Sequence, residues 1–523
     1  MVAGLLAVML AAAVPEEVDT VVVCPRPLQQ AIQPWIRYRT GQGHRIRMLS
    51  ENSSAKKVRA AIRQVAKESK KLRYVLLVGD ADPAARRFAT VKARSLPTFH
   101  ARAKVNVKWG SEPHIATDNP FADLDGDKLP DLAVGRLTAD SPDELTVMIK
   151  KIIRYEQSLA GQWSRRISFV AGVGGFGAIV DNVLETTTKY FLTNGIPPSY
   201  ETTMTYGSWR SPYCPDPRSF SRTSLERLNE GCMFWVYIGH GQRTYLDRVR
   251  VPGATFHILD TRDTKLMKSR QGNPIAIFLS CYTGAYDYPR DCLAEGMLRT
   301  HQGPVAVFSG SRVTMPYAMS VMAHGLMEQY FRHHRATLGD VIVQAKREMV
   351  APKTVGVQRR MLDAVASVIS PNRDQLDAER REHLLLFNLL GDPLTRLAHP
   401  QVIKLQVAKT AVAGQPIQVS GMTKVAGDVQ IELVCPRDRS KHKPTYRAVF
   451  DGSSTSLRKY NLEYKKAHDR IWVAKRVKTQ EGSFQTQITV PEQASGPSFV
   501  RVLVSGSRPG IFALGSAMVK IGE

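Results

Sequence analysis

Cysteine is scarce in this sequence, with 6 residues among 523. A density this low excludes a small scaffold held together by disulfides. Long apolar runs are absent beyond the N-terminus, so no membrane-spanning helix is predicted, and there is no low-complexity tract. Hydrophobic residues make up 43% of the chain and charged residues 23%, which is typical of a soluble globular protein. A chain of this length predicts two or three domains, each with its own core.

Acidic residues are outnumbered: Asp and Glu total 47, Lys and Arg total 72, and the formal net charge is +25. Such a positive field favours anionic partners. The excess is spread along the chain, and no basic stripe carries interleaved aromatic residues, so the sequence predicts no specific nucleic-acid site. Anionic polymers of a cell envelope are the partners that this charge suggests.

The N-terminal stretch Val2–Val14 is apolar but too short to span a bilayer, and Pro15 follows it. Small residues at its end suit a signal peptidase, although no Lys or Arg precedes the stretch. We therefore expect residues 1–16 to be a signal peptide and the protein to be exported, as a secreted, periplasmic or cell-surface protein. The alternative is an apolar N-terminus that packs on the first domain. In an exported protein, Cys214 and Cys232 would be available for a disulfide.

Strands and helices alternate over most of the chain. Short apolar runs such as Val18–Val23 and Tyr74–Val78 are each followed by a helical pattern, which predicts βαβ units and a mainly parallel sheet. A second alternating set begins at Ile167–Val173. We therefore expect one unit of two α/β subdomains, residues 17–160 and 161–400.

The pattern changes at about residue 401. Short alternating runs such as Ile403–Val407 and Phe484–Val490 are separated by Gly, Pro and Ser. These features predict an all-β sandwich of immunoglobulin-like type over residues 401–523, with a stabilising or adhesive role.

Two reactive side chains each follow a buried strand of the predicted sheet. The run Met233–Ile238 ends in a histidine between two glycines, His240, and the run Ile275–Leu279 is followed by Cys281. The carboxyl ends of parallel strands present catalytic groups at one edge of an open α/β sheet. A lone cysteine there is usually a small buried apolar residue, and a Gly-His-Gly triplet is usually a tight turn. Their joint occurrence favours a cysteine nucleophile with a histidine partner.

A thiol ionises only weakly near neutral pH, so a cysteine nucleophile needs help from an imidazole or from backbone dipoles. His240 is placed to supply the imidazole. The backbone N–H groups of Gly241 and Cys281 are candidates for an oxyanion hole. The glycines beside His240 allow a close approach of backbone and substrate.

Several ordered motifs extend this picture along the chain. They are YVLLVGD (Tyr74–Asp80), LDGDKLPDLAVGRL (Leu124–Leu137), WVYIGHG (Trp235–Gly241), FLSCYTG (Phe278–Gly284), LAEGML (Leu293–Leu298), GPVAVFSGS (Gly303–Ser311) and FNLLGDPLTRL (Phe387–Leu397). With them the chain resembles gingipain-type cysteine peptidases, a branch of the caspase-like clan. The resemblance covers about Val18–Ala398, and the predicted sandwich resembles the immunoglobulin-like module that follows gingipain catalytic domains.

The resemblance implies a caspase-like catalytic unit and assigns roles to particular residues. Cys281 matches the nucleophile and His240 the general acid/base, and Asp131, just before Gly135-Arg136, matches the acid that orients the histidine. The implied reaction is attack of the Cys281 thiolate on a peptide carbonyl, an acyl-enzyme, and hydrolysis by water. No cofactor is required for this chemistry.

Asp131 has a second interpretation. Asp123, Asp125 and Asp127 alternate along a glycine-containing loop, as the carboxylates of calcium-binding loops do, and Asp131 follows them. The loop therefore predicts a structural Ca²⁺, and a solvated acidic turn is the alternative. Asp131 is left either as a metal ligand, as the partner of His240, or at the boundary of both.

The basis of specificity is less clearly marked. The resemblance implies cleavage after Arg or Lys by means of an acidic residue in the substrate pocket, and the candidates are Asp140 and Asp143. Both equally suit the N-terminus of a helix, where they complement its dipole. Met315 and Tyr317, in the segment VTMPYA, stand where gingipains carry an aromatic pocket wall.

The leading hypothesis from the sequence is an exported cysteine endopeptidase acting on protein or peptide substrates. A first alternative on the same fold is a sortase-like transpeptidase, which passes the acyl group to an amine instead of water. A second alternative is a non-catalytic protein that binds anionic envelope polymers. The presence of both His240 and Cys281 argues against the second.

Overall fold

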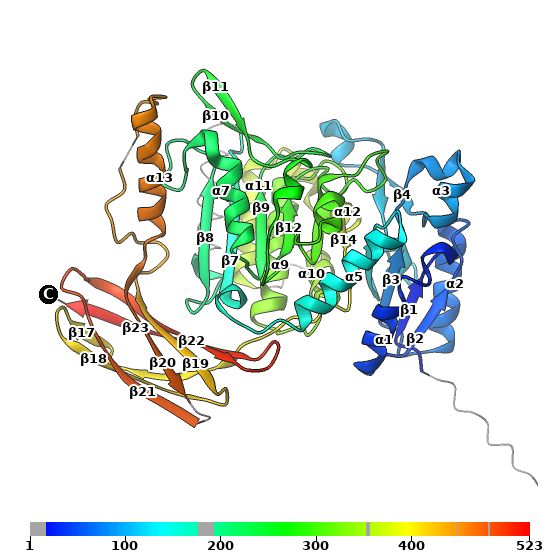
Figure 1. Ribbon diagram of the computed structural model, residues 1–523. Helices are drawn as coiled ribbons and strands as arrows, with labels where there is room; N and C mark the ends of the chain where they lie inside the picture. The colour runs from blue at the N-terminus through cyan, green and yellow to red at the C-terminus, as the bar shows by residue number, and fades with distance from the viewer. Residues whose placement is uncertain (1–16, 176–192, 352–355, 446, 480–481, 523) are drawn as a thin grey trace, which may run out of the picture.

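A ten-stranded sheet forms the centre of the molecule (Figure 1). The computed structural model describes residues 17–175, 193–351, 356–445, 447–479 and 482–522, so the expected signal peptide lies outside the described residues. In spatial order the strands are β2 (Ile46–Leu49), β1 (Thr20–Val23), β3 (Tyr74–Val78), β6 (Ala133–Leu137), β14 (Phe387–Leu390), β13 (Ala306–Gly310), β12 (Ile275–Leu279), β9 (Phe234–Ile238), β7 (Arg166–Ala171) and β8 (Glu201–Tyr206).

The two predicted subdomains share this sheet. Within each half the neighbouring strands run parallel, as the alternation of strands and helices predicts. The halves meet at β14, which runs antiparallel to β13 and parallel to β6. The strands of the N-terminal half therefore run opposite to those of the C-terminal half. The parallel pairing of β14 with β6 is short, with a single registered residue pair, Leu390 with Arg136.

Helices cover both faces of the sheet, with α7 on one face and α9 to α12 packed together on the other (Figure 1). Several of the helices are amphipathic. In α2, for example, Val58, Ile62 and Val65 are buried at helical spacing, and the Ser54 hydroxyl caps the first turn. The helices are α1 (Gln33–Gly41), α2 (Ala55–Glu68), α3 (Ala89–Arg94), α4 (Asn119–Ala122), α5 (Pro142–Glu156), α7 (Phe220–Asn229), α8 (Leu293–Arg299), α9 (Pro316–Phe331), α10 (Leu338–Val350), α11 (Val357–Ile369) and α12 (Leu376–Leu386).

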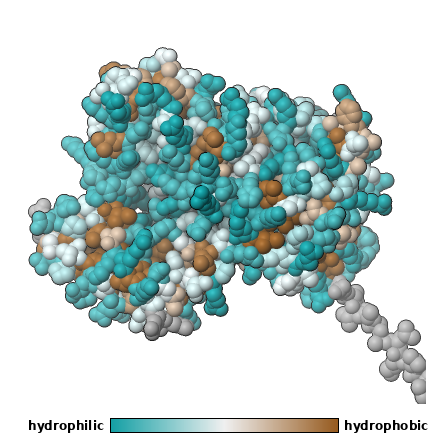
Figure 2. Space-filling view, in the orientation of Figure 1, coloured by the Kyte–Doolittle hydropathy of each residue, from teal (hydrophilic) through white to brown (hydrophobic). Residues whose placement is uncertain are grey.

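Two small hairpins accompany the sheet, β4 (Phe99–Arg102) with β5 (His114–Thr117) and β10 (Arg248–Val251) with β11 (Ala254–His257). Within the described ranges, no helix combines the length and the apolar character needed to cross a membrane. On the face shown in Figure 2, hydrophilic residues cover most of the surface and apolar residues form small separate groups.

The C-terminal region forms two further sheets whose facing side chains share one apolar core. One sheet contains β15 (Gln401–Val402), β23 (Phe512–Gly522), β22 (Gly496–Gly506), β19 (Gly427–Val434) and β20 (Ile471–Thr479), with β17 (Thr410–Val412) also paired to β23. The other contains β16 (Lys404–Val407), β18 (Pro416–Thr423) and β21 (Gly482–Thr489). The immunoglobulin-like type stays a prediction. The all-β prediction needs a correction, because α13 (Ser454–His468) is inserted between β19 and β20.

The sandwich is fixed to the α/β unit by a buried ion-pair triad. The Glu432 carboxylate accepts hydrogen bonds from Arg165, at the start of β7, and from Arg501 on β22. Both arginines and Glu432 are buried. The helix α13 lies against the edge strand β8, where the Tyr464 hydroxyl is 2.8 Å from that of Thr205. The insertion thus covers the open edge of the central sheet.

All six cysteines lie in the described part of the chain, and all are free thiols. The Cys214–Cys232 disulfide that export would allow is not formed. Each of the two is fully buried in its own site: Cys214 donates to the carbonyl oxygen of Pro215 at 3.3 Å, and burial raises the pKa of Cys232 to about 12. Cys281 differs from the other five because it is half-buried.

Candidate active site

Parallel pairing brings the ends of β9 and β12 to the same edge of the sheet. Ile238 pairs with Leu279, the last residue of β12. The residues that follow, His240 and Cys281, line one cavity of about 1430 Å³. The structure therefore brings together the two side chains that the sequence predicts as a pair.

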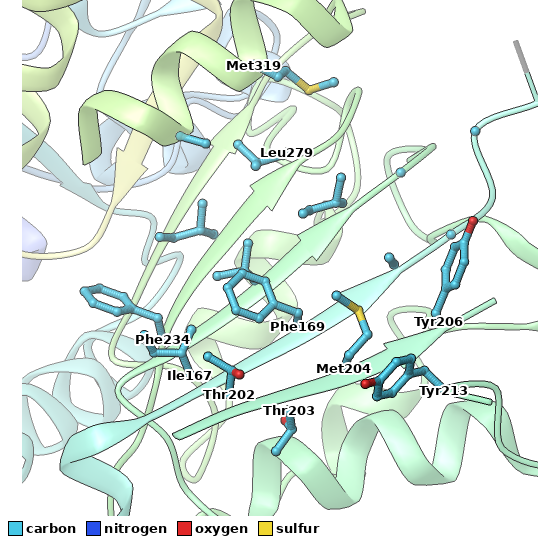
Figure 3. A pocket seen from close by; sticks show the side chains of 18 of the residues that line it. Ile167, Phe169, Thr202, Thr203, Met204, Tyr206, Tyr213, Phe234, Leu279 and Met319 are labelled. Atoms are coloured by element: carbon cyan, nitrogen blue, oxygen red, sulfur yellow. The ribbon is translucent and has the colours of Figure 1, made fainter. Parts of the chain in front are cut away.

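The floor of this cavity is the apolar face of the sheet (Figure 3). The lining includes Gly174 and Thr193, which lie on either side of residues 176–192, and those residues are outside the described part of the chain. Above the floor, Met319 of α9 faces the strand residues. Strands β7, β8, β9 and β12 contribute Ile167, Phe169, Met204, Phe234 and Leu279, among others.

The glycines on both sides of His240 are required by close backbone contacts. Gly239 has φ +149, and a Cβ there would lie 2.9 Å from the Tyr237 hydroxyl. A Cβ on Gly241 would lie 2.6 Å from the Cys281 carbonyl oxygen. Both distances are shorter than a Cβ tolerates, and at Gly241 a side chain would separate the histidine turn from the cysteine turn.

A backbone carbonyl holds the imidazole of His240. Its Nε2 lies in hydrogen-bond contact with the carbonyl oxygen of Gly174, which follows β7. Because a carbonyl can only accept, Nε2 carries the hydrogen, and the neutral ring then has Nδ1 as its basic nitrogen. Sequence reasoning missed Gly174, since any residue type supplies a backbone carbonyl.

Asp131, which the resemblance places on the histidine, is engaged elsewhere. Its carboxylate accepts from the N–H of Leu124 at 2.8 Å and from Arg347 Nη2 at 2.6 Å. It does not belong to the described lining of the cavity. The prediction that Asp131 orients His240 is therefore wrong: its charge is compensated by the arginine on α10.

The Cys281 thiol faces the segment that leads into α9. The N–H of Thr314 points at Sγ from 3.3 Å, and the Thr314 hydroxyl oxygen lies 3.6 Å from Sγ. The segment that leads into α9 thus contacts the sulfur through both the backbone and the side chain of Thr314. Thr314 lies in the segment predicted as a pocket wall, but this contact was not foreseen.

The chain turns sharply after the cysteine. Tyr282 has φ +58, a left-handed conformation that is costly for an aromatic residue, and Thr283 N–H donates to the Cys281 carbonyl at 2.7 Å. This turn presents the thiol to the cavity. In the described part of the chain, the N–H groups of Gly241 and Cys281 donate no hydrogen bond to another residue. Their role as an oxyanion hole stays a prediction.

Of the two predicted wall residues, only Met315 lines the cavity. Its N–H donates to Nε2 of the buried His383 at 2.8 Å. Tyr317 is directed away from the cavity, because its hydroxyl donates to Asp363 at 2.6 Å and contacts Arg380. The prediction that Tyr317 contacts substrate is thus corrected: it anchors α9 to the neighbouring helices.

The acidic candidates for a basic-residue pocket also lie elsewhere. Asp140 pairs with Arg299 at 2.9 Å, and Asp143 sits in the first turn of α5. Neither belongs to the described lining of the cavity. The helix-terminus interpretation is the one that the structure supports.

In the predicted calcium loop, the carboxylates that lie close together are not the three that the sequence predicts. Ligand atoms of Asp123, Asp125 and Asp131 lie within 4.8 Å of one another, and Asp127 is not part of the group. Arginines compete for this position: Arg59 Nη2 lies 3.1 Å from Asp123, and Arg347 pairs with Asp131. Calcium binding therefore stays a prediction, now centred on Asp131 in place of Asp127. A lower unfolding temperature in the presence of a chelator would support it, and an unchanged one would assign these carboxylates to the arginines alone.

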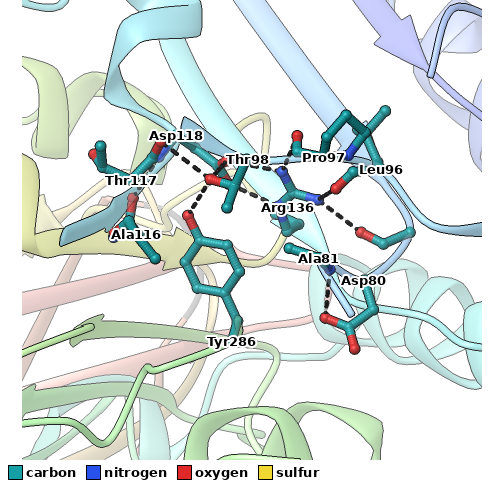
Figure 4. A network of polar contacts seen from close by, with 12 residues as sticks. Asp80, Ala81, Leu96, Pro97, Thr98, Ala116, Thr117, Asp118, Arg136 and Tyr286 are labelled. Atoms are coloured by element: carbon teal, nitrogen blue, oxygen red, sulfur yellow. Dashed lines mark hydrogen bonds and ion pairs between the residues drawn. The ribbon is translucent and has the colours of Figure 1, made fainter. Parts of the chain in front are cut away.

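The Gly135-Arg136 motif forms part of the framework beneath the site (Figure 4). Arg136 is completely buried and forms a two-pronged ion pair with Asp118, at 2.7 and 2.8 Å. Its guanidinium also stacks on Tyr286, in the loop that follows Cys281, and the Tyr286 hydroxyl contacts Thr98 at 2.9 Å. The motif thus joins the first half of the sheet to the cysteine loop.

The first turn of α9 is held by two side chains of α12. His383 accepts from Met315, and burial lowers its pKa to about 4, so it is neutral at physiological pH. Glu379 accepts from the N–H of Ala318 at 3.1 Å. Burial raises the pKa of Glu379 from 4.5 to about 7.

The raised pKa of Glu379 predicts a pH-dependent stability. Between about pH 4.5 and pH 7 the folded state keeps a proton on Glu379 that the unfolded state has lost. The free energy of unfolding is therefore higher at low pH and decreases as the pH rises through this range. Each pKa unit corresponds to about 1.4 kcal/mol. In Glu379→Gln we expect the unfolding temperature, measured from pH 5 to pH 8, to fall less steeply than in the parent protein. Equal slopes in the two proteins would contradict this.

Comparison with known proteins decides the family. The sequence model of peptidase family C25 matches residues 13–398, the region that contains the whole central sheet. The chain belongs to peptidase family C25. Gingipain R2 of Porphyromonas gingivalis (strain W83) is 23% identical over 349 residues, which is 63% of this chain and 42% of that protein. Lys-gingipain HG66 of the same species is 26% identical over 205 residues, 39% of this chain and 11% of that protein. The chain thus spans less than half the length of these relatives.

The fold of this chain is similar to that of solved structures. The crystal structure of the Arg-specific cysteine proteinase gingipain R covers 97% of this chain and 98% of its own, with a TM-score of 0.53 and 16% identity. The complex of the pro- and mature domains of a P. gingivalis gingipain covers 96% of this chain, with a TM-score of 0.51 and 16% identity. At this identity the similarity shows the fold, and the predicted gingipain-like α/β fold is confirmed.

Proposed function

We propose that this C25 chain is a cysteine endopeptidase in which Cys281 is the nucleophile and His240 the general acid/base. The observation that carries the proposal is their position: both follow parallel neighbouring strands and face one cavity. The carbonyl of Gly174 fixes Nε2 of the imidazole as a donor. Nδ1 is therefore the nitrogen that exchanges protons during the reaction.

The reaction runs in two halves. Sγ of Cys281 bonds to the peptide carbonyl carbon while its proton passes to Nδ1 of His240, and the negative oxygen faces the N–H groups of Gly241 and Cys281. The C–N bond then breaks and His240 gives the proton to the leaving amine. In the second half His240 takes a proton from water, the hydroxide oxygen displaces Sγ, and the acid product leaves with the thiol restored.

Cleavage after Arg or Lys is the preference that we propose for this site. The support is the specificity of related proteins, an Arg-specific gingipain R and the Lys-gingipains. The described lining of the cavity includes a carboxylate beside the histidine loop, that of Asp247. The N–H of Asp247 donates to the His240 carbonyl oxygen at 3.1 Å.

The proposal is tested by digesting a diverse peptide library with the purified protein. One portion of the protein is alkylated with iodoacetamide beforehand, and the cut sites are identified by mass spectrometry. We expect cuts after basic residues that disappear on alkylation. Cuts that survive alkylation would contradict a cysteine nucleophile. Ligated products in the presence of an added amine would indicate the transpeptidase, and salt-sensitive binding to an anionic polymer without any cuts would indicate the binding protein.

We also propose that the protein is exported, with residues 1–16 removed. The support is the apolar N-terminal stretch and the small residues at its end. Mass spectrometry of the mature N-terminus in separated cell fractions tests this. An intact Met1 in a cytoplasmic fraction would contradict it.

A further inference from the structure

A half-buried carboxylate outside the cavity connects the two loops that carry His240 and Cys281. Glu112 lies between η3 (Asn106–Trp109) and β5, in the N-terminal half of the catalytic unit. Its Oε2 accepts a hydrogen bond from the Tyr282 hydroxyl at 2.9 Å. Its Oε1 pairs with Nη2 of Arg243.

Arg243 belongs to the loop that begins at His240. Its guanidinium lies 4.5 Å from the ring centre of Tyr282 and 5.0 Å from that of Tyr288. Its carbonyl oxygen accepts from the N–H of Leu293, at the start of α8, at 2.7 Å. The histidine loop is thereby held against two aromatic rings that lie close to the guanidinium, a favourable arrangement for a cation.

Tyr282 belongs to the other loop, directly after Cys281. Its left-handed φ of +58 is costly and persists only where the surroundings hold it. Its N–H donates to the carbonyl of Arg312 at 3.1 Å, and its hydroxyl is held by Glu112. Burial and the nearby Glu112 raise the pKa of Tyr282 to about 12, so the hydroxyl remains a donor at neutral pH.

We propose that Glu112 is a positioning residue, which sets the distance between the Cys281 thiol and the His240 imidazole by binding Tyr282 and Arg243 together. The inference rests on the proposed roles of His240 and Cys281. Glu112 does not belong to the described lining of the cavity, so it acts through the two loops and not on the substrate. A misplacement of reacting groups by about 1 Å costs on the order of 100-fold in rate.

A positioning role and a purely stabilising role predict different results. The Glu112 side chain is 37% exposed, and ion pairs at such positions contribute about 0–1 kcal/mol to stability. The unfolding temperature of Glu112→Gln should therefore stay close to that of the parent. Glutamine keeps the size of the side chain but can no longer accept from Tyr282 and Arg243 as a charged group.

The test compares Glu112→Gln with Glu226→Gln, an exposed carboxylate on α7. We expect Glu112→Gln to lower kcat about 10- to 100-fold with little change in KM, and to shift the pH at which Cys281 alkylation reaches half its maximal rate. Alkylation is read on the Cys281 peptide by mass spectrometry. Glu226→Gln should match the parent in both measurements. Tyr282→Phe, which removes only the hydroxyl, should reproduce part of the effect and serves if Glu112→Gln does not fold.

Parent values of kcat and an unchanged alkylation profile in Glu112→Gln and in Tyr282→Phe would overturn the inference. If Cys281→Ala is inactive while these variants are normal, the proposed function stands and the positioning role fails. If the parent protein cleaves nothing, the alkylation profile still reports the environment of Cys281, so the positioning role is tested separately from the peptidase activity.

Discussion

Replacing Cys281 by alanine should abolish peptide hydrolysis, with a fall in kcat/KM of at least about 10³-fold. The variant lacks the sulfur that forms the acyl-enzyme in the proposed mechanism, and no other described cysteine lines the cavity. The thiol is half-buried and its contacts with Thr314 are long, at 3.3 to 3.7 Å. We therefore expect the unfolding temperature to change little. Both quantities are measured on the purified variant beside the parent protein.

A second cysteine provides the matched control. Cys24 is buried and lies in the N-terminal half, at the end of β1. Cys24→Ala should keep its activity and lose some stability, because a small cavity is left in the core. Substantial hydrolysis by Cys281→Ala would remove Cys281 from the mechanism. Equal losses of activity in both variants would point to folding and not to chemistry.

Replacing Arg136 by methionine should lower the free energy of unfolding by about 3–5 kcal/mol, the usual cost of breaking a buried ion pair. The Asp118 carboxylate would remain buried and lose the guanidinium that neutralises it. The carbonyls of Gly79 and Leu96, which accept from Arg136 at 2.9 and 2.8 Å, would lose their donor as well. Chemical denaturation measures the loss.

Two further variants check this assignment. The double variant Arg136→Met with Asp118→Asn should recover part of the stability, because neither charge of the broken pair then remains buried. Arg332→Met breaks an exposed ion pair with Glu328 on α9 and should cost less than about 1 kcal/mol. A loss in Arg136→Met no larger than that in Arg332→Met would contradict a framework role for the motif.

The sequence was sufficient to predict that His240 and Cys281 lie at the same edge of the sheet, for a physical reason. Parallel neighbouring strands bring their carboxyl ends to one edge, and the buried runs before both residues are strong strand signals. The tight glycine turn at Gly239 and Gly241 is equally local, and its close contacts confirm it. Features that depend on one strand and its turn can be predicted in this way.

Other features of the site depend on contacts between distant segments. The carbonyl of Gly174 reaches His240 from the end of β7, and Glu112 reaches Tyr282 from the other half of the molecule. Neither contact can be predicted from the spacing of residues in the sequence. For Asp131 the sequence misled. Its position beside a motif suggested that it is the partner of His240, but its carboxylate pairs with Arg347 on α10.

The sequence of α13 carries the signals of a helix, although the region around it is typical of β-structure. Leu457, Tyr460 and Tyr464 recur at helical spacing and are buried, and Ser453 caps the first turn. The alternating runs on either side favoured an all-β interpretation of the whole region. The opposite direction of the two half-sheets could not be predicted from local sequence. It depends on the antiparallel strand β14, which lies far from β6 in sequence.

The most direct test of the central claim is to trap the nucleophile with a peptidyl acyloxymethyl ketone that carries arginine next to the reactive carbonyl. The labelled protein is digested and the modified residue identified by mass spectrometry, in the parent and in His240→Ala. We predict one label, on Cys281, that forms at least about 10²-fold more slowly in His240→Ala. A label on another residue, no label at all, or an equal rate in the two proteins would contradict the account of Cys281 and His240 as the catalytic pair.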